Sequence, residues 1–323
     1  LLFIITFDVI RRVTGHSFFM KYRYPAMLHT MPKNLVIFGG FAIGLILMVS
    51  IYGVLHARRV YVRQDPVVIE KSSSLPGLKI TLIADLHLGY NSTKSHVRKI
   101  VDTINSQNVD LVCIAGDLFD NDYDAIKDPD KVADILSGIK SRYGTYACWG
   151  NHDVSEKILA GFTFPQKETI VRDGRFTEFL HHAGITMLED ETVCIDNAFY
   201  LVGRRDKDMA KKEQLLRKTF SEITEPLDPS LPIIVMDHQP GELSEASDAG
   251  VDLDLSGHTH DGQMFPANLV VHFLWENACG VLKKGAMTSI VTSGAGVWGP
   301  AMRVGTNNEV VIANVSFDPA TDQ

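Results

Sequence analysis

Five short apolar segments, each followed at once by metal-binding types of side chain, most constrain how this chain can fold. The segments begin near residues 78, 109, 144, 232 and 251. They lead into Asp85-Leu86-His87, Gly116-Asp117, Gly150-Asn151-His152-Asp153, Asp237-His238 and Gly257-His258-Thr259-His260. Runs of about four to eight apolar residues that end at turn-forming residues are typical of buried strands. The sequence therefore predicts buried strands whose ends carry Asp, Asn and His.

Helical patterns separate several of these segments. Residues 93–106 repeat apolar side chains at a spacing of three and four, with Ser92 or Thr93 as the N-cap, and residues 130–139 repeat the pattern. Further strands are expected at 192–195, 199–202, 288–292 and 309–315. Alternation of strands and helices favours substantially parallel sheets with ligands at the carboxyl ends of the strands. The expected fold is α/β, a two-sheet β-sandwich flanked by helices.

The N-terminal part of the chain has a different character. Residues 35–55 form a charge-free apolar stretch of about 21 residues, long enough to cross a hydrocarbon core of about 30 Å. A cleavable signal peptide is the competing interpretation, but the run is long and no small-x-small site precedes Arg58-Arg59. We therefore expect a membrane anchor region at 1–57, a juxtamembrane linker at 58–76 with a short strand near 67–69, and a folded domain at 77–323.

Membrane topology is left open by the sequence. Basic residues lie on both sides of the apolar stretch, so the positive-inside rule does not determine its orientation. The segment Leu1–Ile10 is also apolar apart from Asp8 and could be the end of another span. The expected location is a cell membrane, with the folded domain on the cytoplasmic side. None of the four cysteines forms a CxxC pair, which fits a reducing compartment.

The polar residues at the strand ends suit a pair of divalent cations. Two ions about 3.5–4 Å apart need a bridging ligand, and a carboxylate such as Asp117 has two oxygens for this purpose. Asp85 and His87 can turn toward one ion, and Asn151 offers a neutral oxygen to the other. His258 and His260 have the same i, i+2 spacing, so one loop can supply both ions. His238 completes the set. Mixed imidazole and carboxylate ligands suit Mn, Fe or Zn.

Such a centre predicts hydrolysis of phosphate esters. Two cations lower the pKa of a bound water and neutralise phosphoryl oxygens during in-line displacement. His152, beside Asn151, is the expected proton donor to the leaving group. Asp120, three residues after Asp117, is the expected carboxylate that orients this imidazole.

Simpler interpretations were weighed against this one. The chain has 12 histidines, and those outside the strand ends are expected to be ordinary surface or core residues. A formal net charge of −8 and the lack of a long basic tract in the folded domain argue against nucleic acid as a partner. Five histidines that each follow a predicted strand are hard to explain by structure alone.

In these motifs the chain resembles the calcineurin-like metallophosphoesterase superfamily from about Leu78 onward. The order D-x-H, G-D-x-x-D, G-N-H-D, H and G-H-x-H is matched throughout. The resemblance implies one metal held by Asp85, His87, Asp117 and His260, and another held by Asp117, Asn151, His238 and His258. It also implies His152 as the general acid.

The stretches DHQP, GHTHDGQMFP and TSGAGVWGPAMRVGTNNEVVI resemble a bacterial branch of membrane-anchored or exported phosphoesterases. Asp261 stands where that branch usually has glycine, which puts the substrate in doubt more than the metals. Lipid-linked or envelope phosphoesters are the first expected substrates, and soluble nucleotides are the alternative. A non-catalytic membrane scaffold is a further alternative. Arg303 is a possible phosphate ligand through its guanidinium, and Arg204-Arg205 is weighed equally as site or surface.

Overall fold

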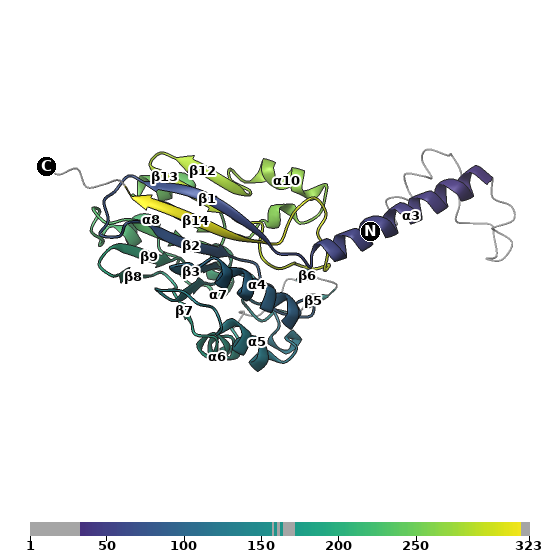
Figure 1. Cartoon of the computed structure of the whole chain (residues 1–323), viewed down its shortest axis with the longest axis horizontal. Coiled ribbons are helices and arrows are strands. Elements are labelled where there is room, and N and C mark those ends of the chain that lie inside the picture. Colours follow the sequence, from purple (N-terminus) through teal and green to yellow (C-terminus); the bar gives the residue numbers. More distant parts are fainter. Residues whose placement is uncertain (1–32, 157, 160–161, 164–171, 318–323) are drawn as a thin grey trace. The chain divides into compact units, whose positions relative to one another are not determined.

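The computed structural model describes residues 33–156, 158–159, 162–163 and 172–317. Expectations for the first 32 residues, including the apolar segment Leu1–Ile10, lie outside the described residues. The described chain contains two six-stranded mixed sheets (Figure 1). The first has the order β1 (Tyr61–Ile69), β14 (Glu309–Phe317), β2 (Leu78–Ile83), β3 (Leu111–Ala115), β4 (Thr145–Cys148) and β7 (Ile185–Met187).

The second sheet has the order β12 (Gly280–Lys284), β13 (Met287–Val291), β11 (Leu253–Ser256), β10 (Ile233–Met236), β9 (Phe199–Gly203) and β8 (Glu191–Ile195). Within each sheet the strands that precede the polar motifs run parallel to one another, as the alternation of strands and helices predicts, whereas β2 is antiparallel to its other neighbour, β14. A small hairpin, β5 (Ile158–Leu159) and β6 (Phe162–Thr163), stands apart from both sheets.

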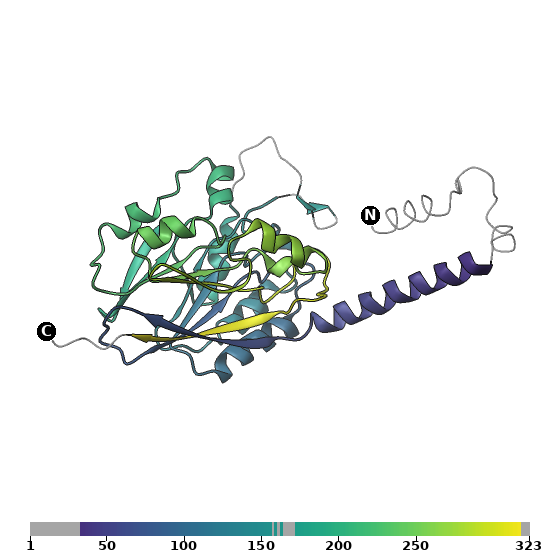
Figure 2. The same cartoon turned by 90° about the horizontal axis from the view of Figure 1, so that it is seen from above.

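Helices cover the outer face of each sheet (Figure 2). On the first sheet lie α4 (Lys94–Ser106), α5 (Pro129–Leu136) and α6 (Gly174–His182), and on the second lie α8 (Phe220–Thr224) and α9 (Leu243–Asp248). The shorter elements are η1 (Tyr123–Ala125), α7 (Lys207–Glu213), η2 (His260–Gly262) and α10 (Ala267–Leu274). The expected N-cap at Thr93 is confirmed, since its side chain accepts from His96 N at 3.2 Å.

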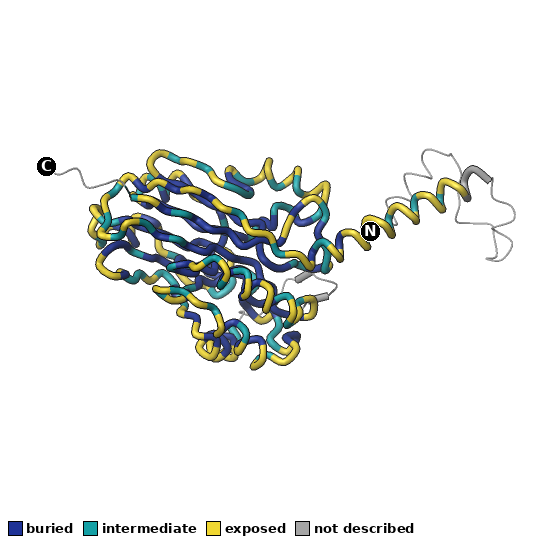
Figure 3. Tube along the Cα trace, viewed as in Figure 1, coloured by how far each residue is buried: buried dark blue, intermediate teal, exposed yellow. Residues whose placement is uncertain are grey.

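Successive side chains along each strand point to opposite faces of the sheet, and this alternation produces the layered core. Leu111 and Cys113 of β3 pack between the two sheets, whereas Val112 and Ile114 pack under the helices of the first sheet. The central strands are therefore apolar on both sides, and Figure 3 shows them as buried. The predicted two-sheet sandwich flanked by helices is confirmed.

The N-terminal helix α3 (Lys33–His56) is long and apolar enough to cross a membrane, and its residues Ile37–His56 have a mean hydropathy of 2.2 over the best window. Its last turn belongs to the compact unit that begins at Tyr52. There Gly53 O accepts from Arg303 N at 3.0 Å, and His56 Nε2 lies 2.9 Å from Asn307 Oδ1.

The expected linker at 58–76 differs from the structure at Tyr61–Ile69. These residues form β1, a nine-residue edge strand paired in parallel with β14 along its whole length. Val67 and Ile69 are buried against the sheet, and Arg63 Nη1 donates to Glu309 Oε1 at 2.7 Å. The strand is difficult to recognise in the sequence because Asp65 and Pro66 interrupt its apolar pattern. Proline within a strand is confined to sheet edges, where β1 lies.

Candidate active site

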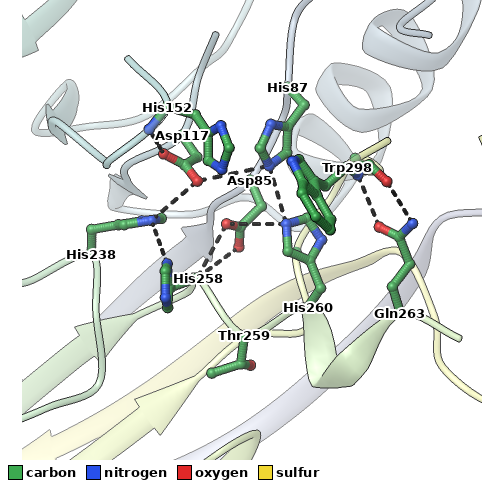
Figure 4. A network of polar contacts seen from close by, with 12 residues as sticks. Asp85, His87, Asp117, His152, His238, His258, Thr259, His260, Gln263 and Trp298 are labelled. Atoms are coloured by element: carbon green, nitrogen blue, oxygen red, sulfur yellow. Dashed lines mark hydrogen bonds and ion pairs between the residues drawn. The ribbon is translucent and has the colours of Figure 1, made fainter. Parts of the chain in front are cut away.

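The polar residues at the strand ends meet at one place in the fold. Asp85 and His87 follow β2, Asp117 follows β3, and Asn151 and His152 follow β4. Histidines from the second sheet reach the same place, with His238 after β10 and His258 and His260 after β11 (Figure 4). The structure thus brings together all the expected metal ligands.

One group of potential ligand atoms contains Asp85, His87 and His260. Their ligand atoms all lie within 4.8 Å of one another. His87 Nε2 lies 3.1 Å from His260 Nε2, and His260 Nε2 lies 3.6 Å from Asp85 Oδ1. Asp85 also accepts from the backbone N–H of His258 at 3.1 Å, which fixes its carboxylate.

A second group contains Asp117, His238 and His258. His238 Nε2 lies 3.1 Å from Asp117 Oδ2 and 3.2 Å from His258 Nδ1. Asn151 Oδ1 lies 3.1 Å from the same His238 nitrogen, so the amide oxygen joins this group.

Asp117 lies between the two groups. Its Oδ2 atom is 3.1 Å from His238 Nε2 and 3.8 Å from His87 Nε2 (Figure 4). Facing ring nitrogens repel unless a cation or a proton lies between them. Metal–nitrogen bonds of about 2.0–2.1 Å place neighbouring ligand atoms about 3 Å apart, close to the spacings observed here. The residues present therefore fit divalent metal ions.

The tautomer of His238 suits this role. Its Nδ1 atom lies 2.8 Å from the backbone oxygen of Ala115, so Nδ1–H donates to that carbonyl. The Nε2 lone pair is then free to face the ligand groups. A backbone acceptor behind a metal-binding imidazole is the usual device that fixes ring orientation and tautomer.

The backbone at these ligands is strained. Asp85, His87, Asp117, His258 and His260 all have φ between 44° and 70°. This left-handed conformation is uncommon for residues other than glycine and concentrates at functional sites. The neighbouring Gly150 is required by close approach, because a Cβ atom there would lie 2.2 Å from Asp117 Oδ1.

Burial destabilises the ionised form of the site carboxylates, and neighbouring positive charge stabilises it. Burial raises the pKa of Asp85 to about 6, an effect that His238 partly offsets. Burial also opposes the charge on Asp117, but the neighbouring His238 and His152 outweigh it and hold the pKa of Asp117 well below its usual range. Two buried carboxylates so close together are stable as anions only beside cations.

The expected dyad of Asp120 and His152 is not the arrangement observed. Asp120 Oδ1 lies 3.5 Å from His87 Nδ1, whereas His152 Nδ1 lies 2.5 Å from Asn121 Oδ1. Asn121 Nδ2 donates to Glu156 Oε2 at 3.1 Å, so the amide is oriented with its oxygen toward the imidazole. Asp120 still lies in a group with His87 and His152 whose ligand atoms are within 4.8 Å.

Arg303 is not placed to contact a phosphate. It is fully buried, and its guanidinium donates to the backbone oxygens of His260, Ser293 and Gly296 at 3.2, 2.6 and 2.9 Å. Its own backbone N–H donates to Gly53. The structure does not support the expected phosphate ligand, because the side chain is fully buried and both terminal nitrogens donate to backbone oxygens around the site.

We expect Arg303→Lys to lower the unfolding free energy by about 3 kcal/mol, because one ammonium cannot replace the fork of donors to three buried carbonyls. Thermal unfolding of the full chain in detergent measures this loss. Arg98→Lys, at an exposed position of α4, is the matched control. An unchanged Tm together with a raised KM would instead restore the phosphate-binding role.

The two arginines of the Arg204-Arg205 pair also form ion pairs in the structure. Arg204 is buried, and its Nη1 lies 3.1 Å from Asp237 Oδ2 and 3.0 Å from Glu242 Oε2. Arg205 Nε lies 3.4 Å from Glu189 Oε1. The buried Arg204 is therefore held by ion pairs, whereas Arg205 is paired through Nε.

Comparison with known proteins agrees with this chemistry. The family model described as calcineurin-like phosphoesterase matches residues 78–262. A Helicobacter pylori protein named as an uncharacterized metallophosphoesterase is 32% identical over 251 residues, which cover 77% of this chain and 62% of that protein. A Danio rerio transmembrane protein with a metallophosphoesterase domain is 28% identical over 285 residues, which cover 81% of this chain and 59% of that protein.

The lengths of these relatives differ. The chain spans about three fifths of the two proteins above. An Aquifex aeolicus protein, also named as an uncharacterized metallophosphoesterase, is 26% identical over 264 residues, and the match covers 80% of this chain and 94% of that protein.

Proposed function

The chain belongs to the calcineurin-like phosphoesterase family, and on that premise we propose a membrane-anchored enzyme that hydrolyses phosphate ester or pyrophosphate bonds with two divalent metal ions. A metal-dependent phosphoesterase activity follows from the family and from the grouped ligands. The number of ions, the residue roles and the substrate are the proposed parts.

The proposal of two ions is supported by the position of Asp117 between the two ligand groups. Asp85, His87, Asp117 and His260 would hold one ion, and Asp117, Asn151, His238 and His258 the other. The bound ions would supply an activated water as nucleophile and would neutralise the phosphoryl oxygens. Manganese, iron and zinc all suit this mixture of nitrogen and oxygen ligands.

The protein itself supplies the proton for the leaving group. We assign this role to His152 in its imidazolium form, in which Nδ1–H donates to Asn121 Oδ1 and Nε2–H is the proton passed to the leaving-group oxygen. Asp120 contributes negative charge beside His87 and His152. Burial lowers the pKa of His152 to about 4 and so disfavours the imidazolium, whereas the neighbouring carboxylates Asp117 and Asp120 favour it.

The membrane anchor supports lipid-linked or envelope phosphoesters as substrates, in preference to soluble nucleotides. The proposed organisation is an anchor at 1–57 joined to a catalytic domain that includes β1. We place this domain on the cytoplasmic side of a bacterial cell membrane. The free state of all four cysteines supports a reducing compartment.

The decisive test is a substrate panel with the full chain, stripped of metal and then supplied with manganese, iron or zinc. The panel contains bis-p-nitrophenyl phosphate, lipid phosphoesters in detergent and cyclic and linear nucleotides. We expect hydrolysis to return with metal and to be fastest on a lipid phosphoester. If protein that carries two ions hydrolyses none of these substrates, the proposed phosphoesterase activity is contradicted. A preference for nucleotides would contradict the proposed lipid substrate.

A further inference from the structure

The helix α10 is exposed in a way that no other α-helix of the folded domain is. None of its eight residues is buried, whereas each of α4 to α9 buries at least two residues. Figure 3 shows the corresponding segment as exposed. Phe273 is 90% exposed and Leu274 is 72% exposed, and Phe265, Leu269 and Val270 are also exposed. A contiguous apolar surface of this kind usually marks an interaction site.

The polarity of α10 is reversed relative to a helix on the surface of a soluble protein. Its sequence, ANLVVHFL, has only Asn268 and His272 as polar residues. His272 Nε2 lies 2.9 Å from Asp261 Oδ1, so this polar group is held by the domain while the apolar side chains face outward. Asp261 thus contacts the polar side of the helix.

Both ends of α10 are joined to the metal site. Asp261 directly follows the proposed ligand His260. After the helix, the ring of Trp275 packs edge-on against the ring of His258 with centroids 5.4 Å apart. The exposed apolar surface therefore lies at the border of the active site.

The same loop contacts both α10 and the end of α3. Phe265 N donates to Val304 O at 2.8 Å on one side of residues 302–308. On the other side, Arg303 N donates to Gly53 O at 3.0 Å, and His56 Nε2 lies 3.1 Å from Thr306 O. The candidate membrane span ends at His56, and Arg58-Arg59 follow, as is typical where a span meets lipid head groups. One loop therefore separates α10 from the place where the chain leaves the membrane.

We propose that α10 and Phe265 lie in the interfacial layer of the lipid bilayer, with Phe273 and Leu274 among the upper acyl carbons. A helix that lies in the plane of the interface buries its apolar face by about 5–10 Å. The metal site then opens at the membrane surface. This consequence rests on the proposed function and favours amphiphilic phosphoesters whose head groups reach the site from the bilayer.

Insertion is tested on the full chain in phosphatidylcholine–phosphatidylglycerol vesicles. An environment-sensitive fluorophore is attached through Phe273→Cys in a Cys194→Ser background, since Cys194 is the exposed native thiol. The unmodified background protein measures labelling of the other cysteines. Val68→Cys is the matched control, because Val68 is an exposed apolar residue seven positions beyond Tyr61 on β1, about 23 Å farther along the strand.

The expected result is a blue-shifted emission at position 273 and quenching by acyl-chain nitroxide lipids about threefold stronger than at position 68. Equal quenching at the two positions would overturn the proposal. Energy transfer between labelled copies without lipid quenching would also overturn it, since a second copy would then cover α10.

A second measurement follows hydrolysis. We expect Phe273→Asp to lower the ratio of vesicle-borne to dissolved substrate hydrolysis about tenfold, and Val68→Asp to leave that ratio as in the parent. A ratio that is equal in the two variants would contradict the membrane role of α10. Failure of the parent to hydrolyse either substrate would contradict the proposed function instead, and the quenching experiment, which needs no turnover, would still decide the position of α10.

Discussion

Asp117→Asn is expected to lower kcat/KM for bis-p-nitrophenyl phosphate by about 10³-fold or more, the equivalent of about 4 kcal/mol of transition-state stabilisation. The amide keeps the size of the side chain but loses its charge and one acceptor oxygen. Asp117 Oδ1 accepts from His152 N at 2.8 Å. If the new amide oxygen keeps that hydrogen bond, its NH₂ group replaces Oδ2 between His87 and His238 and repels cations from both ligand groups.

Metal content separates this effect from simple misfolding. We expect inductively coupled plasma mass spectrometry to find less than half of the parent's bound metal in the Asp117→Asn protein, while the thermal unfolding transition remains cooperative. Asp134→Asn makes the same chemical change at an exposed residue that pairs only with His182 in the described structure, and it should match the parent in both measurements. An Asp117→Asn protein with full metal content and parental activity would contradict the bridging role.

The sequence predicted which polar side chains the fold brings together, because each one closely follows a strand. Strand ends are determined by local apolar patterns, and parallel strands carry their ends to the same edge of a sheet. Asp85 and His258 follow strands of different sheets and lie 173 positions apart in the sequence. Both were nevertheless identified from the residues that precede them. The left-handed backbone at these positions could not be foreseen, since residues other than glycine rarely adopt it and no local pattern marks it.

The sequence predicted which residues lie in the site better than it predicted the hydrogen-bond partner of each side chain. Asp120 and Asn121 are neighbours, and only the fold decides which of them faces His152. The choice of Asn121 depends on Glu156, whose carboxylate orients the amide and is itself bound by Lys212 at 2.9 Å. No spacing in the sequence records such a chain of contacts.

Arg303 illustrates the same limit. The chemistry of its guanidinium suggested a phosphate ligand, but in the fold it donates to backbone oxygens of residues 260, 293 and 296. The strand β1 was predicted only near residues 67–69 and the helix α10 was not predicted, for different reasons. A proline interrupts the pattern of β1, and α10 has the composition of a buried helix although the fold leaves it exposed.

His152→Gln is expected to lower kcat by about 10²- to 10⁴-fold on alkyl phosphoesters, the usual contribution of a general acid. The effect should shrink to less than about tenfold on p-nitrophenyl esters, because a stabilised phenolate leaves without a proton. Metal content should equal that of the parent, since His152 is not among the proposed ligands. His182→Gln, at an exposed residue paired with Asp134, is the matched control and should retain parental activity on both substrates.

The dependence on the leaving group is what identifies the role of His152. A residue that only positions the phosphate would slow alkyl and p-nitrophenyl esters equally, so equal losses would contradict general acid catalysis. Asn121→Ala supplies an intermediate case. It removes the acceptor for the His152 Nδ1–H at 2.5 Å and leaves the imidazole in place. We expect its loss on alkyl esters to be smaller than that of His152→Gln but equally selective for the poor leaving group, because an imidazole without this acceptor still carries the proton but presents it in a less defined orientation.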